Sequence, residues 1–484
     1  MAAIAGVLAL ATGCAAGPDF ERPAPPAASG YVEGPLAATA SADVAGGDAQ
    51  HFVSGADIAG DWWTLFHSRA LDALIEQALA HNPDLAAAQA ALTVAQENLR
   101  AQRGAAYPSV DAGFSASREK DPAAALAPVP STNAFLYNLF TPQVSVSYVP
   151  DVFGLNRRTA ESLQAQARQV RYQMAAAYTT LTANVVVAAI QAAALQAQID
   201  ATQQLVGVNA HMLKILQYQL ARGYASRLDV AAQAAQLAQA DATLPSLRKQ
   251  LAQQRHLLAV LTGRFPAQAP SATFELSSLH LPTQLPVSLP SALVAQRPDV
   301  LQAQANLHAA SADIGIAAAN RLPQIELTAT AGSTALAMSR LFTAGTGFWA
   351  LGADIAAPIF EGGTLLHQER AAKAAYAEAA AQYRSTVLTA FQNVADTLTA
   401  LQQDAEGLKA AAAAADAAKV TLDLSQRQAR DGYASPLALL AAEQTWQQSR
   451  LDLIQAQADR YADTAALFQA LGGGWWHHAN PSKN

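Results

Sequence analysis

Cysteine, charge and long apolar runs are all scarce in this sequence. Its 484 residues include one cysteine, which excludes an internal disulfide framework and a zinc site built from cysteines. Charged residues make up 14% of the chain, with 30 Lys and Arg against 37 Asp and Glu. This basic content is too low to neutralise phosphates, so we expect no nucleic-acid partner. Beyond the N-terminus, no uninterrupted apolar run reaches the roughly 18 residues of a membrane-spanning helix.

Motifs for catalysis and metal binding are absent as well. The ten histidines include no His-Glu-x-x-His pair and no three-ligand spacing, and His477-His478 near the end indicates a frayed tail. The sequence has no Gly-x-Ser-x-Gly elbow, no phosphate-binding loop and no dinucleotide-binding glycine motif. We therefore expect neither an enzyme nor a bound cofactor or metal.

Alanine dominates what is present. Hydrophobic residues make up 51% of the chain, and most of them are alanine, accompanied by abundant glutamine. This composition is typical of long, closely packed helices rather than of a thick globular core.

The N-terminus carries a lipoprotein-type export signal. A short apolar run over residues 2–11 is followed by Thr12, Gly13 and Cys14, which predicts a signal peptide over residues 1–14 and a covalent lipid on Cys14. Ala11 replaces the usual bulky residue and no basic residue precedes the run, so the start of translation stays open. A buried, inert cysteine is the alternative. Residues 15–60, rich in Pro, Gly, Ala and Ser, predict an extended, lipid-anchored tether or wrap.

The rest of the chain is one unit written twice. Asn82-Pro83-Asp84-Leu85 is echoed by Arg297-Pro298-Asp299-Val300, an offset of 298 − 83 = 215. The tetrapeptide Gly-Tyr-Ala-Ser at residues 223–226 recurs at 432–435, an offset of 432 − 223 = 209. These matches predict four consecutive parts: a first repeat over residues 61–263, a linker over 264–290, a second repeat over 291–472 and a tail over 473–484.

Each repeat is predicted to contain a helix, a β-hairpin, a long helix and a returning helix. The first helix is expected to span about 35 residues in one copy, from Leu71 to Gly104, and to run from Asp299 to Asn320 in the other. Strict alternation of apolar and polar residues then predicts two strands in each copy. These strands lie near residues 110–117, 143–148, 325–331 and 349–355.

The long helices are the least ordinary feature. Asn156–Arg222 and Thr364–Arg430 each hold 67 residues without a proline, enough for a helix of about 100 Å. Heptad-spaced leucines on the first returning helix predict an antiparallel coiled coil with an apolar stripe on the outgoing helix. The leucines are Leu237, Leu244, Leu247, Leu251, Leu258 and Leu261, and the stripe is Leu205, Val208, Met212 and Ile215. Pro245 is expected to kink or interrupt the returning helix.

Four alternating strands are too few to close on themselves, because the smallest membrane barrels have about eight strands and an open edge is not tolerated in lipid. We expect a shared barrel, with eight strands from two copies or twelve from three. Phe114, Tyr148 and Trp349 are candidates for its interfacial girdles. A half-buried soluble sheet is the alternative, but the export signal and the matched second hairpin favour the membrane.

These features resemble the TolC-like outer membrane factor family, in particular the NodT/OprM-type lipoproteins of tripartite multidrug (RND) efflux systems. The resemblance is carried by Gly17-Pro18-Asp19-Phe20, Asp61-Trp62-Trp63, Leu289-Pro290-Ser291, Arg297-Pro298-Asp299 and Ile314-Gly315-Ile316-Ala317. It implies an α+β membrane protein that forms a homotrimer, with a twelve-stranded outer-membrane β-barrel (four strands per chain) continued by a long α-helical coiled-coil barrel. The Pro-rich residues 264–298 would belong to an equatorial region.

The implied role is the exit duct of a tripartite pump, lipid-anchored in the outer membrane of a Gram-negative bacterium and extending into the periplasm. The duct would passively conduct drugs and other small toxic molecules, joined by a periplasmic adaptor to an inner-membrane RND-type transporter. A type I protein-secretion duct would use the same architecture, and a periplasmic coiled-coil scaffold without a pore is a third possibility. The sequence does not identify the exported compounds, the cognate pump and adaptor, or the width of the open pore.

The resemblance also implies roles for the two Gly-Tyr-Ala-Ser turns. The residues that would dock the adaptor are Gly223, Tyr224, Ala225, Ser226, Leu228, Gly432, Tyr433, Ala434, Ser435 and Leu437. Charged residues just inside the turns would constrict the closed pore, namely Asp229 in the first copy and Arg430, Asp431 and Glu443 in the second. In the second copy Ala441 occupies a position where the family commonly has Asp, which leaves an ionic lock there open. Solvated charges at helix ends are the alternative interpretation of all four residues.

Overall fold

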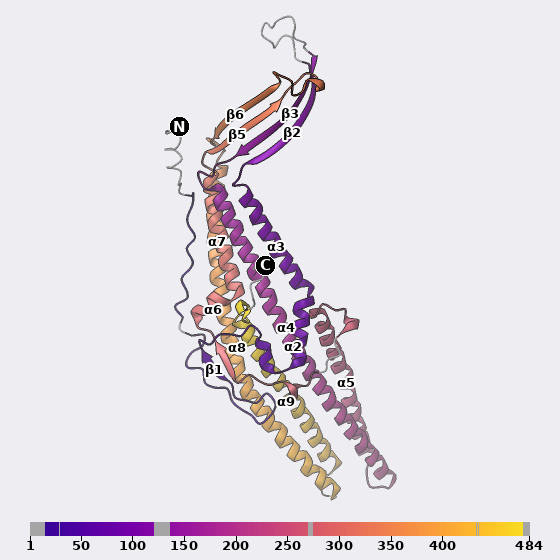
Figure 1. The fold of residues 1–484 in the computed structure, drawn as a ribbon. Coiled ribbons are helices and arrows are strands. Elements are labelled where there is room, and N and C mark those ends of the chain that lie inside the picture. The colour runs from indigo at the N-terminus through magenta and orange to yellow at the C-terminus, as the bar shows by residue number, and fades with distance from the viewer. Residues whose placement is uncertain are drawn as a thin grey trace. The chain divides into compact units, whose positions relative to one another are not determined.

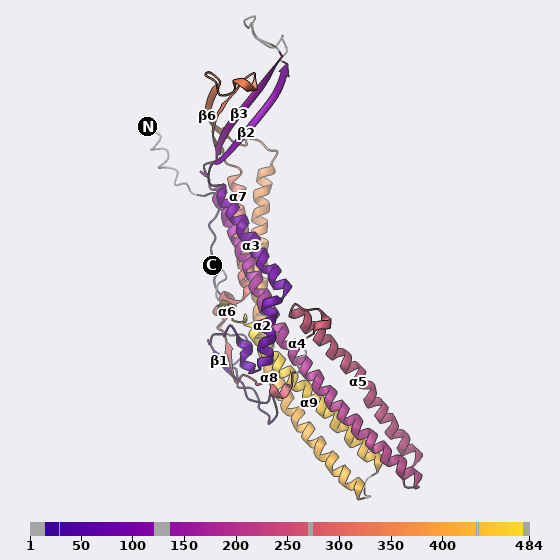
Figure 2. The same ribbon diagram turned by 45° about the vertical axis from the view of Figure 1, so that its right-hand side comes forward.

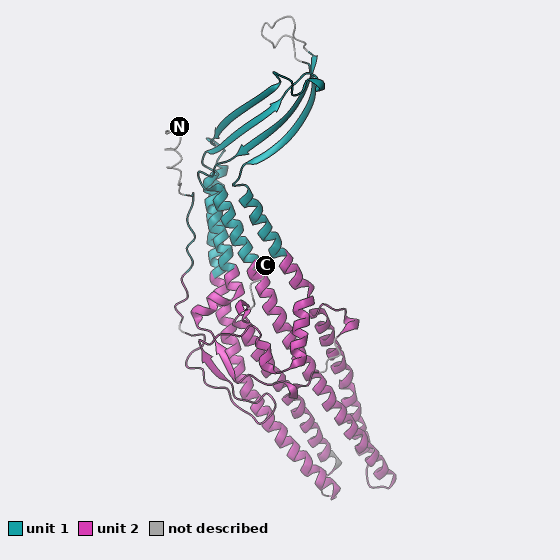
Figure 3. Ribbon diagram, viewed as in Figure 1, with its two compact units in different colours: residues 1–23, 91–170, 303–383 teal, residues 24–90, 171–302, 384–484 magenta. Residues whose placement is uncertain are grey.

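The fold is known from a computed structural model. It describes residues 15–28, 30–120, 136–269, 274–431, 433 and 435–477, with residues 436 and 437 described by their backbone alone. The chain divides into two compact units (Figure 3), and each unit contains parts of both repeats. Unit 1 comprises residues 1–23, 91–170 and 303–383, and unit 2 comprises residues 24–90, 171–302 and 384–484.

Unit 1 contains the predicted pair of β-hairpins. Its antiparallel four-stranded sheet has the order β2-β3-β5-β6 (Figure 1). The strands are β2 (Ser109–Lys120), β3 (Leu136–Tyr148), β5 (Gln324–Ser333) and β6 (Gly347–Ala356), with the short 3-10 helix η4 (Met338–Arg340) between the last two. The helical residues of this unit come from α3 (Pro83–Gly104), α7 (Pro298–Ala319) and the N-terminal parts of α4 (Leu155–Ala221) and α8 (Thr364–Arg430).

Unit 2 contains two helical hairpins and a small mixed region. The hairpins pair the remainder of α4 with α5 (Arg227–Leu261) and the remainder of α8 with α9 (Pro436–Ala470), as Figure 2 shows. The mixed region includes α2 (Arg69–His81), α6 (Pro290–Gln296), and the parallel strands β1 (His51–Ser54) and β4 (Gln284–Val287). Its 3-10 helices are η1 (Trp62–Phe66), η2 (Pro266–Gln268), η3 (Leu276–Ser278) and η5 (Trp475–His477).

The helices repeat in matched lengths. α3 and α7 each have 22 residues, α4 and α8 each have 67, and α5 and α9 each have 35. Their first residues are offset by 298 − 83 = 215, 364 − 155 = 209 and 436 − 227 = 209. The two long helices therefore agree with the prediction to within one residue.

Several local predictions are wrong. The first helix does not run unbroken from Leu71, because the residue before a proline is disfavoured in the helical region. Asn82 is extended, with φ −67° and ψ 122°, and separates α2 from α3. Pro245 lies inside the continuous helix α5, so the expected interruption is absent and the expected kink stays a prediction. His477 is not frayed but lies 2.7 Å from Asp57 through Nε2 and Oδ2. Within residues 15–60, which were expected to form a tether or wrap, His51–Ser54 pairs with β4.

The first coiled coil is built on a stripe displaced from the predicted one. Leu244, Leu251 and Leu258 are buried at heptad spacing, as expected. On α4, however, the buried residues after Leu205 are Asn209 and Leu216, whereas Val208 and Ile215 are exposed. The packed face of α4 is therefore rotated by one residue from the stripe that the apolar residues mark.

Aromatic side chains form the centre of the mixed region in unit 2. The rings of Trp62 and Phe468 stack at 5.0 Å, and Phe66 and Tyr461 lie beside them with centroids 6.3 Å apart. All four side chains are buried. The Asp-Trp-Trp motif thus places η1 against α9, where large aromatic rings pack against one another.

One helix in the described part of the chain has the length and hydropathy of a membrane span. It is α4, and 67% of its most apolar 18-residue window is buried inside the protein. Val185, Val186 and Ile190 are fully buried there. We therefore interpret the apolar part of α4 as packing surface rather than as a membrane span.

Candidate functional site

The strand register sorts side chains into apolar and polar rows across the sheet. Directly paired residues point to the same face of a sheet. One row joins Val110, Val146, Ala329 and Leu351, and the next joins Ala112, Val144, Ala331 and Trp349. Between them, on the opposite face, runs the row Asp111, Ser145, Thr330 and Ala350. One face is therefore apolar across all four strands, and the other is mainly polar.

The apolar face carries large exposed side chains. Leu351 is 74% exposed, and Val110, Phe114, Trp349 and Ile355 are exposed as well. On the polar face, the Ser147 hydroxyl donates a 2.7 Å hydrogen bond to Glu326. Within the described residues, β2 and β6 each pair along one edge only. The sheet thus has an uncovered apolar face and two edges able to accept another strand.

The first Gly-Tyr-Ala-Ser turn is held by a capping box. Gly223, at φ +79°, ends α4, and Ser226 caps α5. The Ser226 hydroxyl accepts from the Asp229 backbone N–H at 3.1 Å, and Asp229 accepts from the Ser226 N–H at 2.9 Å. Hydrogen bonds from the Ser226 hydroxyl and backbone lower the pKa of Asp229 below its ordinary value. The same turn leaves Tyr224 84% exposed and Leu228 exposed beside it.

The second turn resembles the first but has no acidic cap. Ser435 caps α9 by accepting from the Ala438 N–H at 3.2 Å, and Ala438 stands where the first copy has Asp229 (229 + 209 = 438). Tyr433 is 87% exposed, and Arg430 and Asp431 are exposed at the end of α8. Gly432, Ala434 and the Leu437 side chain lie outside the described residues, and so does Cys14.

Glu443 is not a surface charge as expected. Its side chain is 3% exposed, and neither carboxylate oxygen has a hydrogen-bond partner within the described structure. Burial raises its pKa above the ordinary value. Leu439, Ala442, Glu443 and Trp446 follow helical i, i+3, i+4, i+7 spacing, a signal that identifies the buried face of α9. This burial within one chain argues against a place for Glu443 among the residues expected to constrict the pore.

The repeated x-Pro-Asp motif fastens the returning helix of each copy. The Asn82 amide Nδ2 donates to the carbonyl of Leu261, the last residue of α5, at 3.0 Å. In the second copy Arg297 Nη1 donates to the carbonyl of Ala470, the last residue of α9, at 2.8 Å. Each bond satisfies a carbonyl that a helix leaves unpaired at its C-terminal end. The sequence revealed the motif but not this role, because its partner lies 173 or more residues away.

Arg460 is the centre of a buried polar cluster that the sequence did not reveal. Its fully buried guanidinium donates to the Leu401 carbonyl at 2.8 Å and to the Thr39 hydroxyl at 2.7 Å. Asp404 lies nearby, and burial together with Asp463 raises the pKa of Asp404 to about 7. The cluster joins part of the predicted tether to α8 and α9. No group of three potential metal ligands occurs in the part of the chain that the structure describes.

Comparison with known proteins gives a consistent answer. The sequence profile of the outer membrane efflux protein family matches residues 74–264 and 289–473. The probable efflux pump outer membrane protein TtgC of Pseudomonas putida KT2440 is 32% identical over 474 residues, covering 96% of this chain and 93% of TtgC. The pyoverdine export outer membrane protein OpmQ of the same strain is 30% identical over 434 residues, covering 86% of this chain and 88% of OpmQ.

Solved structures of outer-membrane channels share the fold. The channel OprN superposes with a TM-score of 0.84 at 25% identity, covering 96% of this chain and all of OprN. MtrE of Neisseria gonorrhoeae, in its open state, gives a TM-score of 0.80 at 25% identity, covering 96% and 99%. With its exposed apolar sheet face and duplicated long helices, the chain belongs to the outer membrane efflux protein family, whose members are TolC-like channels of the Gram-negative outer membrane rather than enzymes.

Proposed function

We propose that three copies of this chain form the exit duct of a tripartite efflux pump. The four-stranded sheet with two unpaired edges carries this proposal. In lipid every strand edge must be paired, so β2 of one copy would pair with β6 of the next. Three chains of four strands give twelve, a number within the range of membrane barrels. The apolar rows would face lipid, and the polar rows would line the lumen.

The two turns would serve as the periplasmic end of the duct. Tyr224, Leu228 and Tyr433 are large, exposed side chains at turns whose backbone is fixed by caps. Exposed apolar and aromatic groups of this kind are typical of protein-binding surfaces, so we assign them to the periplasmic adaptor. The accompanying residues in the docking set are Gly223, Ala225, Ser226, Gly432, Ala434, Ser435 and Leu437. Asp229, Arg430 and Asp431 would constrict the closed pore.

Small molecules are the proposed cargo. The names of relatives that cover 86% or more of this chain include a toluene efflux pump protein, an antibiotic efflux pump protein and a pyoverdine export protein. All three cargoes are small organic compounds, which favours efflux of drugs or solvents over protein secretion. An inner-membrane transporter would supply the energy, since the duct would conduct passively.

The mass of the detergent-solubilised particle tests the shared barrel. We expect a protein mass near three times the 50.4 kDa of one chain, measured by light scattering with correction for detergent. Reconstitution into planar bilayers should then give small conductances that grow when charged residues at the turns are replaced, for example Asp229→Ala. A monomeric particle would refute the trimer, and a trimer that never conducts would favour a scaffold without a pore.

The lipid anchor at Cys14 is a separate proposal, supported by the export-type run before this only cysteine. Cells that express the protein and are fed a radioactive or alkyne-bearing palmitate should label it, and Cys14→Ser should remove the label. Ala15→Ser is a matched control that leaves the thiol in place. Labelling that persists in Cys14→Ser would contradict the anchor.

A further inference from the structure

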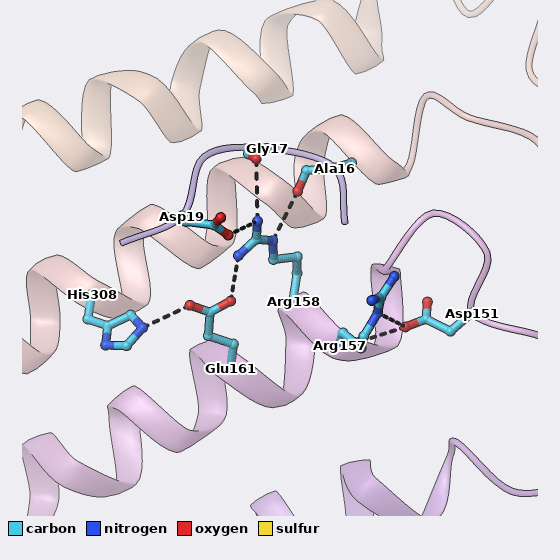
Figure 4. A network of polar contacts seen from close by, with 8 residues as sticks. All are labelled: Ala16, Gly17, Asp19, Asp151, Arg157, Arg158, Glu161 and His308. Atoms are coloured by element: carbon cyan, nitrogen blue, oxygen red, sulfur yellow. Dashed lines mark hydrogen bonds and ion pairs between the residues drawn. The ribbon is translucent and has the colours of Figure 1, made fainter. Parts of the chain in front are cut away.

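The first described residues of the chain lie against two helices of unit 1, α4 and α7. Figure 4 shows the segment around Ala16, Gly17 and Asp19 beside these helices. The Ala16 N–H donates to the Phe153 carbonyl at 3.0 Å. The Arg158 guanidinium donates from Nε to the Ala16 carbonyl at 3.0 Å and from Nη2 to the Gly17 carbonyl at 3.3 Å. Three consecutive bonds therefore hold the backbone of this segment, independently of its side chains.

Two glycines allow the backbones to approach this closely. Gly17 has φ +86°, and a Cβ there would lie 2.4 Å from the Gly315 Cα. A Cβ on Gly315 would lie 2.8 Å from both the Ala16 carbonyl oxygen and Arg158 Cγ. No side chain fits at either position without moving the segment away from α7. The segment thus fits against α7 sterically, in addition to its hydrogen bonds with α4.

Arg158 and Glu161 use all of their side-chain nitrogen and oxygen atoms in this contact. All three guanidinium nitrogens of Arg158, whose side chain is 5% exposed, donate hydrogen bonds, including one to Asp19 at 2.8 Å and one to Glu161 at 2.7 Å. The second Glu161 oxygen lies 2.9 Å from His308 Nε2, and the His308 ring stacks on Phe20 at 4.2 Å. Burial alone would raise the pKa of Glu161, but hydrogen bonds from Arg158 and His308 lower it below its ordinary value.

These contacts are unequal in strength. The Asp19 side chain is 94% exposed, so its ion pair with Arg158 contributes little. The two carbonyl bonds come from a buried, fully partnered guanidinium, whose planar fork suits several acceptors at once. Removing it would leave the Ala16 and Gly17 carbonyl oxygens and one oxygen of Glu161 without this donor. Arg158 is therefore the centre of the site, and Asp19 is peripheral.

We propose that Arg158, Glu161, His308 and Gly315 form a binding site for the chain's own segment Ala15–Phe20, which fixes the point where the lipid on Cys14 leaves the protein. The inference rests on the lipid anchor of the proposed function. In the sequence, Cys14 stands two residues before Ala16, the first residue whose backbone is held by hydrogen bonds. A free tether would instead let the anchor range over a distance that grows with its length.

Spin-label mobility tests the site in the full-length chain. Cys14→Ser removes the only native cysteine, and Glu21→Cys then places a nitroxide on an exposed residue just after the segment. We expect a strongly immobilised spectrum, which should sharpen to that of a mobile label in Arg158→Met. Arg157→Met is the matched control, because Arg157 neighbours Arg158 but pairs with Asp151. An unchanged spectrum in Arg158→Met, or a mobile label in the parent, would overturn the proposal.

A second variant acts from the segment itself and leaves the helices intact. Gly17→Ala should also release the label, whereas Gly34→Ala should not, because Gly34 shares the positive φ but has no atom within 4 Å of an added methyl group. Asp19→Asn should leave the spectrum nearly unchanged. Since every sample lacks Cys14, the result does not depend on lipid attachment. Failure of lipid labelling would therefore refute the lipid anchor but not the binding site. A mobile label at residue 21 would refute the binding site but not the lipid anchor.

Discussion

Leu351→Arg is expected to abolish functional channels in the outer membrane. Leu351 is exposed on the apolar face of β6, in the row with Val110, Val146 and Ala329. An arginine on the lipid face of a barrel costs about 2 to 4 kcal/mol near the middle of the bilayer. In the proposed trimer the substitution occurs three times in each barrel. Cells that depend on this channel should become as sensitive to its cargo as a deletion strain.

Thr330→Arg is the matched control. Thr330 pairs with Ser145 and Ala350 on the opposite face of the same sheet, and arginine is tolerated on the lumen side. Heat-dependent mobility on SDS gels and the amount of protein in outer-membrane fractions should remain normal for Thr330→Arg and fall strongly for Leu351→Arg. Equal levels of folded protein for the two variants would contradict the assignment of faces.

Gly263→Ala is expected to be the most destabilising single-methyl change. Gly263 ends the first returning helix at φ +71°, and a Cβ there would lie 2.1 Å from the His81 carbonyl oxygen. The left-handed conformation costs a non-glycine residue about 1 to 2 kcal/mol, and forced overpacking adds about 1 to 3 kcal/mol. Because the contact is with backbone, α2 or the end of α5 must move.

The duplication supplies its own control. Gly472, the counterpart of Gly263 (263 + 209 = 472), also has a positive φ, but a Cβ there would lie no closer than 3.3 Å to the Trp476 ring and 3.5 Å to backbone. Gly472→Ala should therefore lower the free energy of unfolding mainly through the cost of the left-handed conformation. We expect thermal unfolding, followed by tryptophan fluorescence, to begin at a clearly lower temperature for Gly263→Ala. Equal midpoints would show that the close contact with His81 is not energetically important.

Periodic features of this fold were predictable from sequence. The two 67-residue helices and both hairpins follow from proline-free length and strict alternation, which are local properties of the chain. Their matched copies made the prediction stronger, because a chance pattern at 155–221 has no reason to return at 364–430. The exposed positions of Tyr224 and Tyr433 followed from the same repeat.

Contacts between distant residues were not predictable in this way. Residues 15–60 have no periodicity, and their partners, such as Arg158 and Arg460, lie more than a hundred residues away. The burial of Glu443 was not predicted, because its expected role came from the family resemblance, although its spacing from Leu439 and Ala442 marks the buried face. A residue's charge indicates whether its side chain prefers solvent, but the position of the residue in the helical repeat determines which face of the helix it occupies.

Each returning helix is hydrogen-bonded at one end, so a change in its tilt would displace the other end the most. Asn82 and Arg297 bind the final carbonyls of α5 and α9, and the capped turns lie at the opposite ends. A helix of 35 residues is about 52 Å long. A tilt of about 10° around the fastened end would therefore carry the turn through about 9 Å, given that length. A displacement of that size exceeds the width of a hydrated ion, although the hydrogen-bonded end of the helix would hardly move.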